Sequence, residues 1–475
     1  MFSLGAVNAL DMLIQVVLPM ILVRLLNEHD FSLYRALWLL TGTTQSVLAM
    51  AVPASLFYFL PRNNRATGSI YLLQAAAYMF AASVLSLLTS FLWASSHGIE
   101  ATQGLQVAVF VACWLFSTLL ESMFNAQQRI ARQAQVNLFY AVLRLLLVVG
   151  VAYFYRSWAA VLFAHMTLGL LKALACLVAV RRHAEPGTRP TREHWREQFR
   201  FALPFGVSAA LSLTRQRIDQ WIVASVYSSA QFGLYSVAAV FTPIQGLIRA
   251  TVNQIVLPEL NRLEARADLK PMLALNQRGN IGVALIMFPT LFFIATWASW
   301  LLVLLFTSNY SGASPVVQAY CLALLIDSME VVTLLIALRQ GRFMMYTDAV
   351  LMVLTVLGSL AGAYWYGLPG AAVGQIVGSL FAQLATYTRC SRLTNVALRD
   401  LQAWNTLAKI AAAAAFGAVS SKIAMTFFTS TSALANLLPA AFVFVIAYYL
   451  ALRVAGMSAK IREIFGPRLT RWIGF

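Results

Sequence analysis

About 14 apolar segments, most of them near 20 residues long, alternate with short hydrophilic loops along this chain. A segment of that length crosses the roughly 30 Å of hydrocarbon in a bilayer as an α-helix. With 60% hydrophobic and 11% charged residues, the chain is too apolar for a water-soluble globular protein. The sequence therefore predicts an all-α integral membrane protein with about 14 transmembrane helices.

If the N-terminus lies in the cytoplasm, the cationic residues of the loops are concentrated on one side of the membrane. Nearly every loop Lys and Arg falls on one side, whereas the other side carries only Arg156, with Arg24 and Arg35 at loop edges. Because cationic loops resist translocation, this pattern predicts a bacterial inner-membrane protein with both termini in the cytoplasm. The net charge of +17 is then explained by orientation and by contact with anionic membrane lipids, and no nucleic-acid partner is expected.

An internal repeat and a charged stretch predict the domain organisation. Phe31-Ser32-Leu33-Tyr34 opens the second segment, Phe232-Gly233-Leu234-Tyr235 opens the eighth, and the longest hydrophilic stretch, Arg181–Arg200, lies between them. The repeat predicts two pseudo-symmetric lobes of about six helices each, related by an axis along the membrane normal. The expected parts are a first lobe at 1–183, a cytoplasmic linker at 184–200, a second lobe at 201–392, and two further helices with a basic tail at 393–475.

Ionisable residues inside the apolar segments are the candidate functional residues, because charge at membrane depth costs a few kcal/mol or more. The cations are Arg24, Arg144, Lys172, Arg215, Arg217 and Arg249, and the deep acids are Asp11, Asp219, Asp327 and Glu330. Guanidinium groups form bidentate hydrogen bonds that suit pyrophosphate, so a cavity with these cations would attract a phosphorylated ligand. Interhelical hydrogen bonding or snorkelling explains any single one of them equally well.

Two spacings refine these expectations. Arg215 and Asp219 are four residues apart, which predicts an intrahelical ion pair, whereas Arg217 has no local acid and needs a partner acid on another segment or an anionic substrate. Asp327 and Glu330 are three apart on one predicted helix, which fits a coupling-ion site or structural pairing with a neighbouring segment.

Catalytic signatures are missing from the sequence. It has no P-loop, no glycine-rich nucleotide fingerprint, no HExxH and no GxSxG. The loops expected on the periplasmic side are short, and the four cysteines show no metal-ligand spacing. We therefore expect no enzyme, no metal site and no cofactor beyond coupling to a proton or sodium gradient, and a two-lobed transporter fits best.

The region of the seventh and eighth segments carries a resemblance to a known family. Pro204, Asp219, the run Phe232-Gly233-Leu234-Tyr235-Ser236-Val237-Ala238-Ala239 and Pro258-Glu259-Leu260 resemble the polysaccharide transporter family of the multidrug/oligosaccharidyl-lipid/polysaccharide (MOP) exporter superfamily. That family includes the O-antigen and exopolysaccharide repeat-unit flippases. The likeness extends over essentially the whole chain.

The resemblance implies a V-shaped pair of six-helix lobes around a central cationic cavity. By alternating access, such a protein moves an undecaprenyl-pyrophosphate-linked oligosaccharide to the periplasmic leaflet for lipopolysaccharide, capsule or exopolysaccharide synthesis. Cavity arginines bind the substrate in the family, which falls here on Arg24, Arg215, Arg217 and Arg249. Expected partners are the lipid-linked oligosaccharide, a polysaccharide polymerase and glycosyltransferases. Alternatives are a multidrug or cation antiporter, a lipid-linked peptidoglycan precursor flippase, a membrane polymerase or ligase, and a scaffold.

Overall fold

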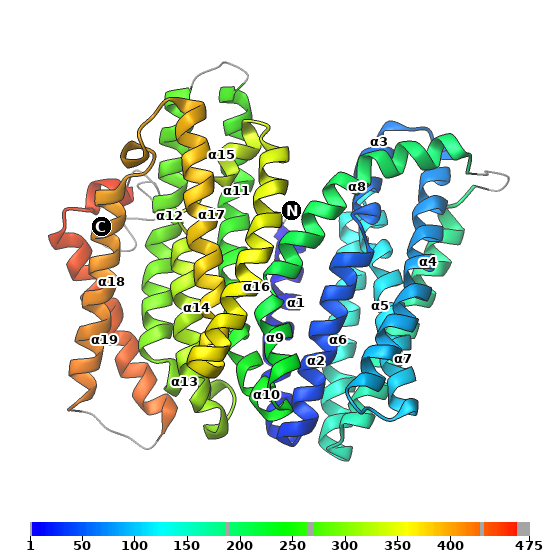
Figure 1. Cartoon of the computed structure of the whole chain (residues 1–475), viewed down its shortest axis with the longest axis horizontal. Helices are drawn as coiled ribbons and strands as arrows, with labels where there is room; N and C mark the ends of the chain where they lie inside the picture. Colours follow the sequence, from blue (N-terminus) through cyan, green and yellow to red (C-terminus); the bar gives the residue numbers. More distant parts are fainter. Residues whose placement is uncertain (1, 186–189, 265–268, 428–431, 463–475) are drawn as a thin grey trace. The chain divides into compact units, whose positions relative to one another are not determined.

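The computed structural model describes residues 2–185, 190–264, 269–427 and 432–462. Throughout these residues the chain is helical, with turns and short loops and no β-strand, which confirms the predicted all-α fold (Figure 1). The chain divides into two compact units, Met1–Gly233 and Leu234–Phe475. The predicted lobe boundaries at 184–200 and 392 stay a prediction.

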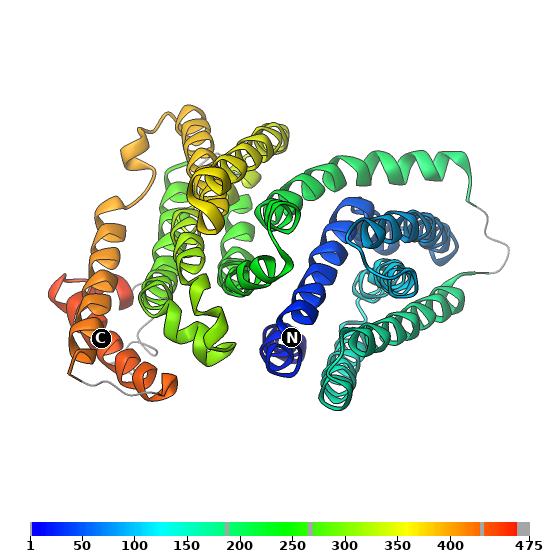
Figure 2. The same ribbon diagram turned by 60° about the horizontal axis from the view of Figure 1, so that its bottom comes forward.

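The first unit consists of nine helices, followed by α10 (Ser229–Ala238), which contains the division between the units. They are α1 (Phe2–Leu25), α2 (Glu28–Leu48), α3 (Val52–Arg62), α4 (Arg65–Ser96), α5 (Ala101–Ala126), α6 (Ile130–Tyr155), α7 (Trp158–His183), α8 (Arg192–Arg215) and α9 (Ile218–Val226). Helix α5 packs against both α4 and α7, and α1 lies beside α6 (Figure 2). Buried apolar side chains of α3, α4 and α5, such as Leu56, Phe59, Met79 and Leu119, form its core.

The second unit contains the remaining helices. They are η1 (Ala239–Phe241), α11 (Pro243–Glu264), α12 (Leu269–Thr296), α13 (Ala298–Leu305), η2 (Ser308–Ala313), α14 (Ser314–Asp327), α15 (Val332–Ala337), α16 (Gly341–Ala371), α17 (Val373–Thr394), η3 (Leu398–Asp400), α18 (Trp404–Met425) and α19 (Ala433–Val454). Helix α12 packs against α11, α14 and α18, while α16 packs on α17 and α18 on α19. One core cluster joins α11, α12, α15 and α17 through Leu260, Met272, Leu335 and Cys390.

Among the described residues, 9 helices are long and apolar enough to cross a membrane, and the number rises to 10 when the bent pair α2 and α3 is one span. The protein is thus a multi-pass membrane protein. The predicted total of about 14 spans stays a prediction, because several predicted spans are formed by two short helices.

Several of the predicted spans are interrupted, among them the second, the seventh and the tenth. The second bends by 49° between α2 and α3, where Met50 and Ala51 have positive φ. The seventh is divided into α8 and α9, and the tenth into α14 and α15. Exposed backbone groups at such breaks need polar partners inside the membrane, so the breaks are where functional side chains are expected.

The charged stretch predicted as a linker is partly helical. Helix α8 begins at Arg192, with Thr191 as its N-cap, and its first turns pack on α3 and α4. Gln198 Nε2 donates to Ser55 Oγ at 2.9 Å, and Tyr71 Oη donates to Glu197 Oε2. The apolar residues of this stretch give α8 an amphipathic face. The many charged residues around them made the stretch look like a linker in the sequence.

Candidate functional site

Arg217 lies at the interruption between α8 and α9 in the first unit. Helix α8 ends at Arg215, Gln216 caps it, and Arg217 precedes the first residue of α9 with φ −121° and ψ 1°. The interruption frees this side chain from the regular helical arrangement of its neighbours. It therefore reaches α2, which packs against both α8 and α9.

The guanidinium of Arg217 occupies the space beside Gly42 of α2. A β-carbon added to Gly42 would stand 1.6 Å from Arg217 Nη1 and 2.6 Å from its Cζ. No side chain fits there while Arg217 keeps this position, so the glycine provides the room for the cation. Arg217 thus places a positive charge beside Gly42, between α2 and the break that separates α8 from α9.

Neighbouring groups hold α9 to α2 without neutralising this charge. Trp221 Nε1 donates to Thr43 Oγ1 at 2.9 Å, and the Trp221 ring packs edge-on against Trp93. In the part of the chain that the structure describes, no carboxylate lies within ion-pair distance of Arg217. An anion at this position would therefore meet a cation that no acid of the described residues neutralises.

Arg215 and Asp219 flank the same interruption. Asp219 is fully buried, whereas Arg215 is half-buried with a buried Nε. Gln216 and Arg217 form a turn between the two residues, and the intrahelical ion pair expected for them stays a prediction.

Lys172 and Arg144 lie deeper in the first unit among aromatic rings. Lys172 Nζ lies 2.9 Å from Glu121 Oε1 and 4.6 Å from the centroid of the Trp114 ring. The guanidinium carbon of buried Arg144 lies 5.6 Å from the Trp38 ring centroid. Glu121 and the ring thus provide Lys172 with partners inside the unit, and its predicted role in substrate binding stays a prediction.

Arg249 of the second unit joins α11 to the interruption between α14 and α15. Its Nη1 donates to Asn280 Oδ1 at 2.8 Å, its Nη2 donates to the carbonyl of Ser328, and its Nε lies 3.5 Å from Glu330 Oε1. The same Glu330 accepts a hydrogen bond from Thr333 at 3.0 Å. Arg249 and Glu330 thus form a closed network that supports the break.

The acids predicted as a shared pair occupy different elements. Asp327 is the last residue of α14, whereas Glu330 lies in the break before α15 begins. Their expected common helical face is absent for that reason, and the carbonyl of Glu330 instead accepts a 2.8 Å hydrogen bond from Asn280 Nδ2. The ion pair with Arg249 fits structural pairing, the second of the two roles expected for Glu330, and the choice between the two roles stays a prediction.

The remaining candidates lie in α1. Arg24 is exposed in its last turn, and its Nη1 donates to the carbonyl of Met20 at 2.5 Å. The side chain of Asp11 lies outside the described residues.

Sequence reasoning missed two kinds of residue at these candidate positions. Gly42 belongs to a polar run, Thr41-Gly42-Thr43-Thr44-Gln45-Ser46, inside an otherwise apolar segment. Asn253, Asn276 and Asn280, which hold Glu330 and its neighbours, are amides at membrane depth. Uncharged polar residues inside apolar segments could have indicated these positions. A search limited to ionisable residues does not find them.

Comparison with known proteins connects these features to a family. A family model described as "Polysaccharide biosynthesis protein" matches residues 21–315, which is more than half of the chain. Among curated proteins, no sequence matches the chain.

Solved structures agree on the fold. The chain is similar to a structure titled "Lipid II flippase MurJ, inward closed conformation", with a TM-score of 0.75 and 12% identity over 95% of this chain and 99% of that one. It is also similar to an inward-facing multidrug resistance MATE family transporter of the MOP superfamily, with a TM-score of 0.61 and 12% identity over 82% of this chain and 96% of that one. At this identity the likeness establishes the fold, that of MOP-superfamily transporters.

Proposed function

Because the chain belongs to the polysaccharide biosynthesis protein family, we propose that it is a flippase for a lipid-linked oligosaccharide. The proposed substrate is a polyprenyl-pyrophosphate-linked repeat unit of a surface polysaccharide. The protein would move it from the cytoplasmic to the periplasmic leaflet by alternating access. Family membership and the transporter fold support the class of activity, and the substrate is inferred from the charge of the site.

The position of Arg217 carries the proposal. Its guanidinium is seated in the gap left by Gly42, and no described carboxylate pairs with it. A planar guanidinium offers parallel donors to two oxygens of a phosphate, and such charge-assisted hydrogen bonds are about twice as strong as neutral ones. Arg215 of the same unit would add to the attraction for a pyrophosphate.

A binding experiment with three variants tests this assignment. Each hydrogen bond to a charged group contributes about 1.5–3 kcal/mol, so Arg217→Ala is expected to weaken binding of undecaprenyl-pyrophosphate oligosaccharide by about 10- to 100-fold. Gly42→Ala keeps the cation but adds a β-carbon where the guanidinium lies, so it is expected to weaken binding as well. Arg217→Lys should retain part of the affinity, because it keeps the charge but loses the bidentate geometry.

The matched control is Gly246→Ala, because an added β-carbon there meets open space. Binding is measured by microscale thermophoresis on purified protein whose folding is verified by its unfolding temperature. Unchanged affinity in both Arg217→Ala and Gly42→Ala would refute the assignment of the pyrophosphate to Arg217.

A lipid-linked peptidoglycan precursor is the second candidate substrate. The structural likeness to the lipid II flippase favours it, since this neighbour is covered over nearly its full length. Both substrates present a pyrophosphate, so Arg217 serves either. Competition between the two lipids for the purified protein separates them: the proposed substrate should displace the precursor at lower concentration.

The paired state of two membrane acids disfavours the cation antiporter. Glu121 is bonded to Lys172, and Glu330 lies in contact with Arg249. An organic cation would have to displace an internal partner from each of them. Asp219 and Asp327 are the acids that we propose for coupling to a proton or sodium gradient.

The charge asymmetry of the loops supports the remaining parts of the proposal. Both termini would lie in the cytoplasm of a bacterium, with the protein in the inner membrane. Glycosyltransferases that complete the repeat unit on the cytoplasmic side, and a polymerase that consumes it on the other side, are the partners that this substrate implies.

A further inference from the structure

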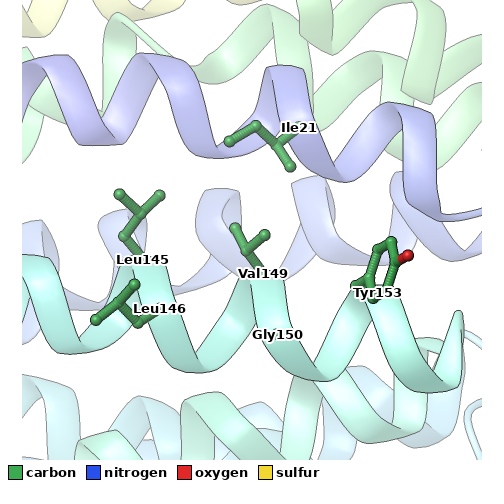
Figure 3. Close-up of a pocket in the computed structure, with 6 residues that line it drawn as sticks. All are labelled: Ile21, Leu145, Leu146, Val149, Gly150 and Tyr153. Atoms are coloured by element: carbon green, nitrogen blue, oxygen red, sulfur yellow. The ribbon is translucent and has the colours of Figure 1, made fainter.

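An apolar groove of about 450 Å³ lies between α1 and α6 of the first unit (Figure 3). Ile21 of α1 faces Leu145, Val149 and Tyr153 of α6 across it. Gly150 contributes no side chain, and an added β-carbon there would have no neighbour within 4 Å. The missing side chain thus leaves room in the wall of the groove.

The groove opens to lipid. In the most apolar window of α6, only 22% of the residues are buried, a smaller share than in the corresponding windows of α4, α5 and α7. Leu146, which lines the groove, is 66% exposed. A membrane protein covers such an apolar surface with hydrocarbon chains, because water does not reach it.

Aromatic residues fix the depth of the groove in the membrane. Tyr153, Phe154 and Tyr155, at the end of α6, are 60%, 80% and 71% exposed, as expected for side chains at the membrane interface. From Tyr153 to Leu145 the helix descends by about 12 Å. That depth is close to the hydrocarbon thickness of one leaflet, which is about half of roughly 30 Å.

Two cations lie at the interfacial end of this groove. Arg24 follows Ile21 by one turn on the same face of α1, and Arg156 caps the C-terminus of α6 one turn after Tyr153. Arg156 is exposed and adopts a left-handed conformation with φ 47°. On this side the loops carry hardly any other cation, and the positive-inside rule disfavours arginine there. An anionic headgroup at this depth would lie near both positive charges.

We propose that this groove binds one anionic glycerophospholipid of the outer leaflet, with an acyl chain between α1 and α6 and its phosphate at Arg156 and Arg24. A long polyprenyl chain would leave most of its length outside a groove of this depth, which favours an acyl chain. The inference does not depend on the proposed flippase activity, because the bound lipid belongs to the membrane itself.

Native mass spectrometry of the full-length protein in detergent tests this proposal, with phosphatidylglycerol and phosphatidylethanolamine of identical chains as probes. Wild-type protein is expected to retain one phosphatidylglycerol more tightly than phosphatidylethanolamine. Gly150→Leu fills the groove and should abolish that preferential retention, whereas Gly246→Leu, at another glycine with open space, should leave it unchanged. Leu has a higher helix propensity than Gly, so Gly150→Leu is expected to keep the fold, which its unfolding temperature verifies.

Variants of Arg156 test the proposed contact with the lipid headgroup. Arg156→Asn removes the charge and keeps a residue that tolerates positive φ, and it should weaken phosphatidylglycerol retention about fivefold. Arg156→Lys should restore most of it. Wild-type retention in Gly150→Leu, equal retention of the two phospholipids, or a polyprenyl phosphate in place of the phospholipid would each overturn the proposal.

Discussion

Arg217, Lys172 and Arg249 are all predicted to carry charge at membrane depth, but their surroundings differ. Lys172 and Arg249 each meet a carboxylate of their own unit, whereas Arg217 lies against a glycine. An arginine that is already paired contributes to folding, and one without a paired acid remains available to an anion. The structure therefore distinguishes, by their surroundings, three cations that the sequence places in one group.

The Arg249 network is expected to be essential for the stability of the second unit. Arg249→Ala leaves Glu330 partly buried without its cation, and breaking such a pair costs about 3–5 kcal/mol. The double variant Arg249→Met with Glu330→Gln should recover much of the loss, because no uncompensated charge remains. Unfolding temperature in detergent measures both, and an Arg249→Ala protein as stable as wild type would argue against a structural role.

The Lys172–Glu121 pair should respond unequally to removal of either partner. The Lys172 side chain is 9% exposed, whereas that of Glu121 is 41% exposed. Glu121→Gln leaves a buried ammonium without its acid, while Lys172→Met leaves a carboxylate that polar surroundings still solvate. We therefore expect Glu121→Gln to lower the unfolding temperature more than Lys172→Met. The reverse order would mean that the environment of Glu121 is the drier one.

At the scale of elements, the breaks within helices are the features that the sequence did not predict. The apolar segments predict the all-α fold, because their length and composition are those of membrane-spanning helices. Pairing of Asp327 with Glu330 was inferred from the spacing of an unbroken helix, and the break after Asp327 removes that spacing. Such breaks depend on amides and carbonyls of other helices, such as Asn280, which no local pattern reveals.

Helix α8 allows a prediction about local stability. Tyr71→Phe removes the hydrogen bond to Glu197 but keeps the ring that stacks on Phe59 at 4.2 Å. Loss of a hydrogen bond to a charged group should raise hydrogen–deuterium exchange in the first turns of α8 by about tenfold, with little change elsewhere. Tyr78→Phe, whose hydroxyl bonds to Leu48 of α2 instead, is the control. Equal exchange in both variants would show that the Glu197 contact does not anchor α8.

The whole molecule offers a test of orientation. The charge pattern predicts that Arg399 faces the cytoplasm and that the turn at His97 faces the periplasm. In a background without native cysteines, His97→Cys should react with a membrane-impermeant maleimide in intact cells, and Arg399→Cys only after permeabilisation. Labelling in the opposite sense would invert the assigned direction of transport.

At this scale the chain belongs to the polysaccharide biosynthesis protein family and has the fold of the transporters it is similar to, while the proposed substrate rests on the chemistry of Arg217. The most direct measurement is translocation of a fluorescent undecaprenyl-pyrophosphate oligosaccharide across proteoliposomes, with wild type compared with Arg217→Ala and Gly246→Ala. Our account predicts translocation by wild type and Gly246→Ala and its loss in folded Arg217→Ala. Translocation that persists undiminished in Arg217→Ala, or its absence from folded wild type with several glycans, would contradict the account.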